Sequence, residues 1–155
     1  MGQTIVTDLK LSQCAISLVK TSSTVFVVMS FKDKPDLKDM YASFKAVCGS
    51  YKPPYNCYNM VEKRDIKRIF PEILKSIERS AFVIVDLSEG RPNVYYELGY
   101  AEALNKPLVI TARKGSEIHF DAKDLPIIFW ESQEELKAQL KLKIDEIAEG
   151  HGRIV

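Results

Sequence analysis

Two continuous apolar runs constrain this chain more than any other feature of its sequence. One extends from Val25 to Met29 and the other from Ala81 to Val85, directly before Asp86. A strand with one face in water alternates apolar and polar side chains, whereas these runs carry apolar, mostly β-branched residues at successive positions. Each run therefore predicts a strand that is buried on both faces, as in the middle of a parallel sheet covered by helices.

Segments with helical periodicity alternate with these runs and with three shorter candidate strands. The shorter strands are expected at residues 55–59, 107–111 and 127–130, and the helices at residues 37–47, 69–77, 92–104 and from about 133 onward. Strands that alternate with helices form right-handed crossovers and a parallel sheet. We therefore expect a three-layer α/β fold whose five-stranded parallel sheet has the flavodoxin-like order 2-1-3-4-5.

The beginning of the chain stands apart from this regular pattern. Apolar residues within residues 1–23 follow a mixed period, which fits a short helix and an added edge strand equally well. Residues 24–155 contain no internal repeat, low-complexity tract or linker, and their number suits a single hydrophobic core. We therefore expect an N-terminal extension over residues 1–23 and one domain over residues 24–155.

The charge balance argues against electrostatic partners. The chain has 22 Lys and Arg residues against 21 Asp and Glu residues, for a net charge of +1. This balance provides no basic surface for nucleic acid or an anionic membrane. No apolar run approaches the roughly 20 residues that cross a bilayer, and the N-terminus lacks the pattern of a secretory signal. We expect a cytoplasmic protein that binds neither nucleic acid nor membrane.

The cysteines and histidines give no reason to expect a metal site. Cys14, Cys48 and Cys57 include no CxxC pair, and His119 and His151 accompany no cluster of ligand residues. Zinc ribbons and redox motifs both need closely spaced cysteines. We interpret the cysteines as reduced thiols that pack as small apolar side chains.

The predicted strand order places a ligand site between the ends of the first and third strands. Open parallel sheets bind ligands outside the carboxyl ends of their strands, where the strand order reverses. The first strand leads into Ser30 and Phe31. The third strand ends in Asp86, and Ser88 follows it by two residues. These four side chains are therefore candidate ligand-binding residues.

The helix expected over residues 92–104 brings a glutamate to the same place. At about 100° per residue, one stripe of this helix faces the core and consists of Val94, Leu98 and Ala101. Asn93 and Glu97 lie in a row on the flank of that stripe. Glu97 is thus expected at the seam between core and water. Asn93 is expected near the free N–H groups of the helix N-terminus, which suit a phosphate or carboxylate.

Fingerprints of several other proteins with this architecture are absent. The chain contains no GxGxxG after the first strand, no GxxxxGK[ST] and no GxSxG. A classical dinucleotide site, a P-loop and a nucleophile elbow are therefore excluded. A receiver domain would share Asp86 but would need an acidic pair after the first strand, where this chain has Ser30 and Phe31.

Residues 86–101, which read DLSEGRPNVYYELGYA, resemble a known motif. It is the strand–loop–helix of the nucleoside 2-deoxyribosyltransferase superfamily and of the related bacterial TIR-like domains. Both place an aspartate and a small hydroxyl residue at a strand end, followed by a helix with a glutamate in an E-L-G-x-A context. The resemblance covers about residues 24–112: residues 25–31 resemble the first strand of these families, and Arg64-Asp65 resembles their polar loop over the ligand.

The resemblance implies chemistry at the N-glycosidic bond of a nucleotide, with NAD as the leading substrate. Glu97 would be the catalytic carboxylate, which attacks the sugar carbon or offsets its positive charge as the base leaves. Asp86 would be the second catalytic residue. Asp86 and Asn93 would orient Glu97 or hold sugar hydroxyls. Tyr41 or Phe31 would stack on a base. The other implied ligand contacts are Ser30, Arg64, Asp65 and Ser88.

The resemblance leaves three activities open. They are NAD cleavage or cyclisation, nucleoside 2-deoxyribosyl transfer, and nucleotide binding or signalling without turnover. No cofactor is implied besides the nucleotide substrate. TIR-type enzymes often complete their sites across subunits and, in bacteria, often serve antiphage defence. The implied assembly is therefore a homo-oligomer or a complex with a partner effector protein.

Overall fold

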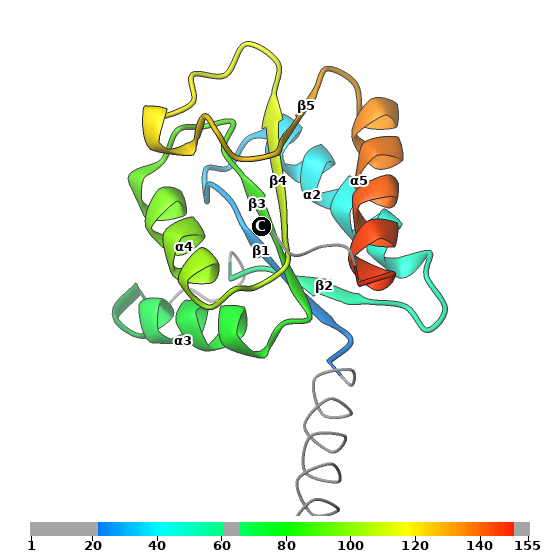
Figure 1. Cartoon of the computed structure of the whole chain (residues 1–155). Helices are drawn as coiled ribbons and strands as arrows, with labels where there is room; N and C mark the ends of the chain where they lie inside the picture. Colours follow the sequence, from blue (N-terminus) through cyan, green and yellow to red (C-terminus); the bar gives the residue numbers. More distant parts are fainter. Residues whose placement is uncertain (1–21, 61–65, 151–155) are drawn as a thin grey trace, which may run out of the picture.

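The computed structural model describes residues 22–60 and 66–150, in which strands and helices alternate (Figure 1). The elements are β1 (Thr24–Val28), α2 (Pro35–Gly49), β2 (Asn56–Tyr58), α3 (Ile66–Arg79), β3 (Phe82–Asp86), α4 (Pro92–Ala103), β4 (Leu108–Arg113), the 3-10 helix η1 (Phe120–Ala122), β5 (Ile127–Trp130) and α5 (Gln133–Ala148). Every strand and helix expected after residue 23 is present, with ends that differ by a few residues.

The five strands form one sheet in the order β2-β1-β3-β4-β5, and every neighbouring pair is parallel. Strand β1 lies between β2 and β3, because Phe26 is opposite Tyr58 on one side and Val83 on the other. After β2 the chain crosses back past β1 to form β3, and β4 and β5 then extend the sheet on that side. The predicted α/β fold and strand order are confirmed.

Helices cover both faces of this sheet: α3 and α4 lie on one face, and α2 and α5 on the other (Figure 1). Neighbouring residues of a central strand enter opposite cores. In β1, Val28 belongs to the core under α3 and α4, whereas Val27 belongs to the core under α2 and α5. This alternation explains why the central strands are apolar at every position.

Helix α4 packs against the core through the apolar stripe that its periodicity predicts. Val94, Leu98 and Ala101 are each at most 3% exposed. The helix begins at Pro92, whose missing N–H costs little in a first turn. It ends before Asn105, which adopts the left-handed conformation with φ of 53° and directs the chain into β4. This packing fixes the rotation of α4 and therefore the position of Glu97.

Strand β2 is shorter than the segment expected at residues 55–59. It is an edge strand, and its three residues, Asn56 to Tyr58, are exposed or half-buried. Residues 1–21 lie outside the described residues, so the N-terminal extension and its boundary stay predictions. Within the described ranges, no helix is long and apolar enough to cross a membrane.

Candidate active site

The carboxyl ends of β1 and β3 lie side by side where the strand order reverses. Ser30, just after β1, is 4% exposed, and its hydroxyl oxygen accepts a hydrogen bond from the backbone N–H of Lys32 at 3.3 Å. The next residue, Phe31, is 44% exposed. The end of β1 therefore offers a buried hydroxyl group beside an exposed aromatic ring.

Asp86 ends β3 with both carboxyl oxygens engaged inside the protein. Oδ1 accepts a hydrogen bond from the backbone N–H of Ser88 at 3.1 Å. Oδ2 accepts hydrogen bonds from the hydroxyls of Ser88 at 3.0 Å and Thr111 at 2.9 Å. The Ser88 hydroxyl oxygen also accepts from the backbone N–H of Arg113 at 2.9 Å. This network fixes the turn after β3 and joins it to β4.

The environment of Asp86 favours a structural role at this turn. Burial raises the pKa of its carboxyl to about 6, although the hydrogen bonds from Thr111 and Ser88 act in the opposite direction. These bonds point the carboxyl oxygens toward β4 and the turn. The sequence identified Asp86 as a candidate through its place at the strand end, and its contact with a substrate stays a prediction.

Glu97 lies on the flank of α4 and is 3% exposed. Burial raises the pKa of its carboxyl to about 7, and a hydrogen bond from the side chain of Asn93 opposes this rise. Asn93 itself is exposed, one turn nearer the helix N-terminus. Glu97 is thus a buried carboxyl group near a solvent-accessible amide. With a pKa near neutrality, it can exchange between its ionised and protonated forms under physiological conditions.

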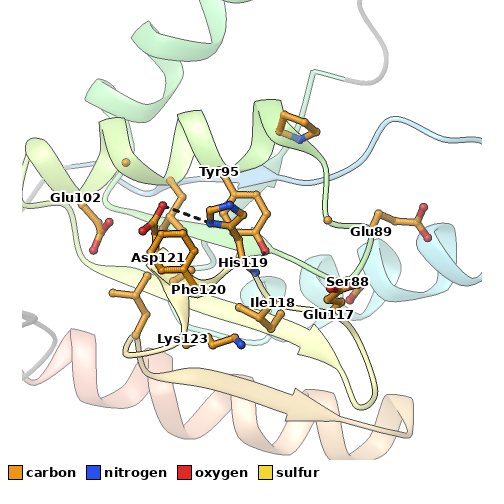
Figure 2. A pocket seen from close by; sticks show the side chains of 16 residues that line it. Ser88, Glu89, Tyr95, Glu102, Glu117, Ile118, His119, Phe120, Asp121 and Lys123 are labelled. Atoms are coloured by element: carbon orange, nitrogen blue, oxygen red, sulfur yellow. Dashed lines mark hydrogen bonds and ion pairs between the residues drawn. The ribbon is translucent and has the colours of Figure 1, made fainter.

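Two cavities open around the carboxyl ends of the strands. The larger has a volume of about 980 Å³ and is bounded by the loop after β3, by α4 and by the segment around η1 (Figure 2). The smaller, of about 350 Å³, lies between the end of β1 and α2. Both volumes suit small-molecule sites. Glu97 is not among the residues that line either cavity.

The larger cavity lies against the flank of α4 that carries Tyr95, opposite the flank of Glu97. The rings of Tyr95 and His119 are 5.7 Å apart, and those of His119 and Phe120 are 5.0 Å apart. Figure 2 shows these rings gathered beside the helix, with Asp121 paired to His119 at 3.3 Å. The Tyr95 hydroxyl oxygen accepts from the backbone N–H of His119 at 3.0 Å. These contacts hold the segment before η1 against α4.

The smaller cavity brings together three residues that the sequence selected. Ser30, Phe31 and Tyr41 all line it. Lys45 places its ammonium group 4.5 Å from the centre of the Tyr41 ring. Asn59, a buried residue after β2 that sequence reasoning missed, lines it as well, together with the charged residues Lys32, Asp33, Lys38 and Lys45. The cavity therefore combines aromatic rings, a hydroxyl and an amide, which suit a heterocyclic base, with four charged side chains.

The remaining candidates are distributed around this region. Ser88 lines the larger cavity, whereas Asn93 and Glu97 lie on α4 and line neither cavity. Arg64 and Asp65 lie outside the described residues. In residues 22–60 and 66–150, no group of three or more His, Cys, Asp or Glu side chains is placed to hold a metal ion.

Sequence reasoning also missed two ion pairs that join the loop after β1 to the loop after β3. Glu89 accepts from the ammonium groups of Lys32 and Lys34, each at 2.9 Å. The lysines follow β1 and the glutamate follows β3, so about 55 residues of chain separate them. Surface charges in two loops carry no periodic signal, and only the fold brings them together.

No protein-family model matches the chain, and no curated protein matches its sequence. Among solved structures, the CMP N-glycosidase BcmB of Clostridium botulinum matches with a TM-score of 0.62. The two proteins share a fold. Their sequences are 14% identical, and the match covers 77% of this chain and 98% of the other. At this identity the comparison establishes the fold alone.

Proposed function

We propose that this protein cleaves or transfers at the N-glycosidic bond of a nucleotide, with Glu97 as the reacting carboxyl group. The main support is the environment of Glu97, a buried carboxyl with a pKa of about 7 on the helix that borders the reversal of strand order. Further support comes from the shared fold with a protein described as a CMP N-glycosidase.

The proposed reaction uses the ionised form of Glu97. As the bond between the sugar C1′ and the base nitrogen breaks, the sugar gains positive charge, and a carboxylate beside C1′ offsets that charge or bonds to it. The base leaves with the bonding electron pair. Nicotinamide leaves NAD as a neutral molecule, whereas a base such as cytosine also takes up a proton. Water then supplies a hydroxyl group to C1′ in hydrolysis, or an acceptor supplies its nucleophilic atom in transfer.

The residues around Glu97 would position the substrate. Asn93 holds the carboxyl through its side-chain amide and is exposed, so a bound sugar would reach it. The smaller cavity would hold the base, with Phe31 or Tyr41 against its face and Ser30 at its edge. In this arrangement the sugar crosses the carboxyl end of β1 toward α4.

Three substrate classes follow from the motif and the fold. NAD is the substrate implied by the TIR-like resemblance of residues 86–101. A nucleoside monophosphate is suggested by the name of the structural neighbour, and a deoxyribonucleoside by the transferase branch of the superfamily. We keep NAD as the leading substrate and test the others beside it.

A second candidate is nucleotide binding without turnover. It is favoured by one observation, that Glu97 lines neither cavity in the described structure. A protein of this kind would sense a nucleotide and pass the signal to a partner effector. It would bind ligand in the smaller cavity and leave the glycosidic bond intact.

Mass spectrometry of a nucleotide panel separates these proposals. The protein is incubated with NAD, the four ribonucleoside monophosphates and their nucleosides and deoxynucleosides, at low and high protein concentration. Release of nicotinamide or of a free base, or formation of a cyclised product, supports the enzyme. Activity only at high concentration supports a site completed by a second copy. A bound nucleotide that is recovered unchanged in every case contradicts catalysis and supports the binding module.

A further inference from the structure

Glu89 bridges the two loops that border the reversal of strand order. Its Oε2 accepts from the ammonium group of Lys32 and its Oε1 from that of Lys34, both at 2.9 Å. The side chain of Glu89 is 18% exposed, whereas those of Lys32 and Lys34 are 45% and 44% exposed. The carboxylate is therefore the inner member of the cluster, and both lysines are accessible to solvent.

The cluster lies at the boundary between the two cavities. Glu89 lines the larger cavity, and Lys32 lines the smaller one. Figure 2 shows Glu89 at the edge of the larger cavity, pointing away from the rings of Tyr95 and His119. The ion pairs thus link the loop after β1 to the loop after β3, and they separate the base-sized cavity from the larger one.

Among the described residues, Lys32 and Lys34 both form their ion pair with Glu89. The neighbouring acidic side chains are engaged elsewhere, because Asp33 pairs with Lys38 and Asp36 pairs with Arg113. The hydrogen bonds from Lys32 and Lys34 lower the pKa of Glu89, so its carboxyl is ionised at neutral pH. The cluster is therefore a two-cation site occupied by one carboxylate from the opposite loop.

We propose that Lys32 and Lys34 bind the phosphate of the nucleotide substrate, and that Glu89 occupies this site until the nucleotide arrives. This inference rests on the proposed function and specifies its substrate as a phosphate-bearing nucleotide. The phosphate of a nucleoside monophosphate carries more negative charge than a carboxylate and offers three acceptor oxygens, and the diphosphate of NAD carries two negative charges. Ion pairs at exposed positions are weak, so a phosphate displaces Glu89 at little cost.

The exchange also has a structural consequence. Release of Glu89 frees the loop after β3 from the loop after β1, which joins the two cavities at the place where they are now divided. Helix α4 begins three residues after Glu89 and has no side-chain cap at its N-terminus. A phosphate that displaces Glu89 therefore acts on the loop that leads directly into the helix carrying Glu97.

Titration with inorganic phosphate tests the site without any need for turnover. Binding is measured by isothermal titration calorimetry for the wild type, for Glu89→Gln, for the double variant Lys32→Gln/Lys34→Gln and for Lys75→Gln. The last is a matched control, since Lys75 pairs with Glu72 on α3, away from the cluster. Glu89→Gln should bind phosphate about five-fold more tightly, as expected for the loss of a competing exposed ion pair. The double variant should lose binding, and the control should behave as the wild type.

Two results would overturn the inference. One is equal phosphate binding by the wild type and the double lysine variant. The other is a Glu89→Gln variant that binds no more tightly than the wild type while its unfolding transition is unchanged. If phosphate binding follows the expected order but no nucleotide is turned over, the phosphate site stands and the enzymatic proposal fails. If nucleotides and nucleosides are cleaved equally well and phosphate does not bind, the enzyme stands and the phosphate site fails.

Discussion

Asn93 lies one turn before Glu97 on α4, and its side chain hydrogen-bonds the Glu97 carboxyl. The bond joins an exposed amide to a buried acid. It lowers the pKa of Glu97, while burial raises that pKa to about 7. In the proposed reaction, Asn93 therefore helps to set the pH at which Glu97 becomes charged.

Removal of this amide should move the pH dependence of the reaction. In Asn93→Ala, the pKa of Glu97 is expected to rise by about one unit, since a hydrogen bond to the charged form is lost. The acid limb of the kcat/KM profile should move upward by the same amount, because activity needs the ionised carboxylate. Asn93→Gln keeps the amide and should recover part of the shift. An unmoved acid limb in Asn93→Ala would show that the bond does not tune Glu97.

Stability should fall as pH rises from about 4 to about 7. Glu97 and Asp86 have folded pKa values of about 7 and about 6, above their usual values of 4.5 and 3.8. The folded chain thus holds these protons more tightly than the unfolded chain. The resulting stabilisation is complete below the usual values and is lost as pH rises through the folded values. The effect is on the order of 3 kcal/mol for each carboxyl.

Urea denaturation across this pH range measures the effect. In Glu97→Gln, the free energy of unfolding should fall less as pH approaches 7, because the carboxyl with the higher folded pKa is gone. At neutral pH this variant should be at least as stable as the wild type. A wild-type profile that rises over the same interval would mean that these carboxyls are not buried in the folded protein.

The hydroxyl of Thr111 should stabilise the ionised form of Asp86. Thr111→Val removes one of the hydrogen bonds to Oδ2 and is expected to cost about 1–3 kcal/mol. The cost should be larger above the Asp86 pKa than below it, because this bond lowers that pKa. Thr111→Ser keeps the hydroxyl and serves as the control. If the loss of stability in Thr111→Val does not change with pH, the hydroxyl does not stabilise the ionised form of Asp86, and the loss comes from altered packing.

The sequence was sufficient for those features that depend on local periodicity. The runs at residues 25–29 and 81–85 predict central strands because both of their faces are apolar. The stripe of α4 predicts its packing, and with it the flank position of Glu97. Residues 55–59 gave a weaker signal, since β2 lies at the sheet edge and buries its side chains only in part.

Contacts between distant side chains were not predictable in this way. The bonds from Lys32 and Lys34 to Glu89 join residues more than 50 positions apart, and charged loop residues are common in any sequence. The sequence predicts Cys48 and Cys57 to be separate packed thiols. In the fold, the end of α2 meets β2 and the two thiols form a hydrogen bond. Such pairings depend on the loops, where no repeating pattern limits the side-chain positions.

The role of Asp86 is not determined by its position in the sequence. Its place at a strand end is shared by ligand-binding and turn-forming aspartates, and the catalytic role that the resemblance implies for it stays a prediction. The described hydrogen bonds to Ser88 and Thr111 are those of a turn-forming residue. Strand position alone does not fix the direction of a carboxyl, whereas its hydrogen-bond donors do.

The rate of base release by Glu97→Gln, compared with Glu102→Gln, tests the central claim most directly. Both residues lie on α4, but Glu102 is exposed and lines the larger cavity, whereas the base is proposed to bind in the smaller one. With the nucleotide that the wild type cleaves fastest, Glu97→Gln should reduce turnover by at least about 100-fold while nucleotide binding is retained. Glu102→Gln should stay within about two-fold of the wild type. Wild-type turnover in Glu97→Gln, or no base release by the wild type from any nucleotide, would contradict the assignment of Glu97 as the reacting group.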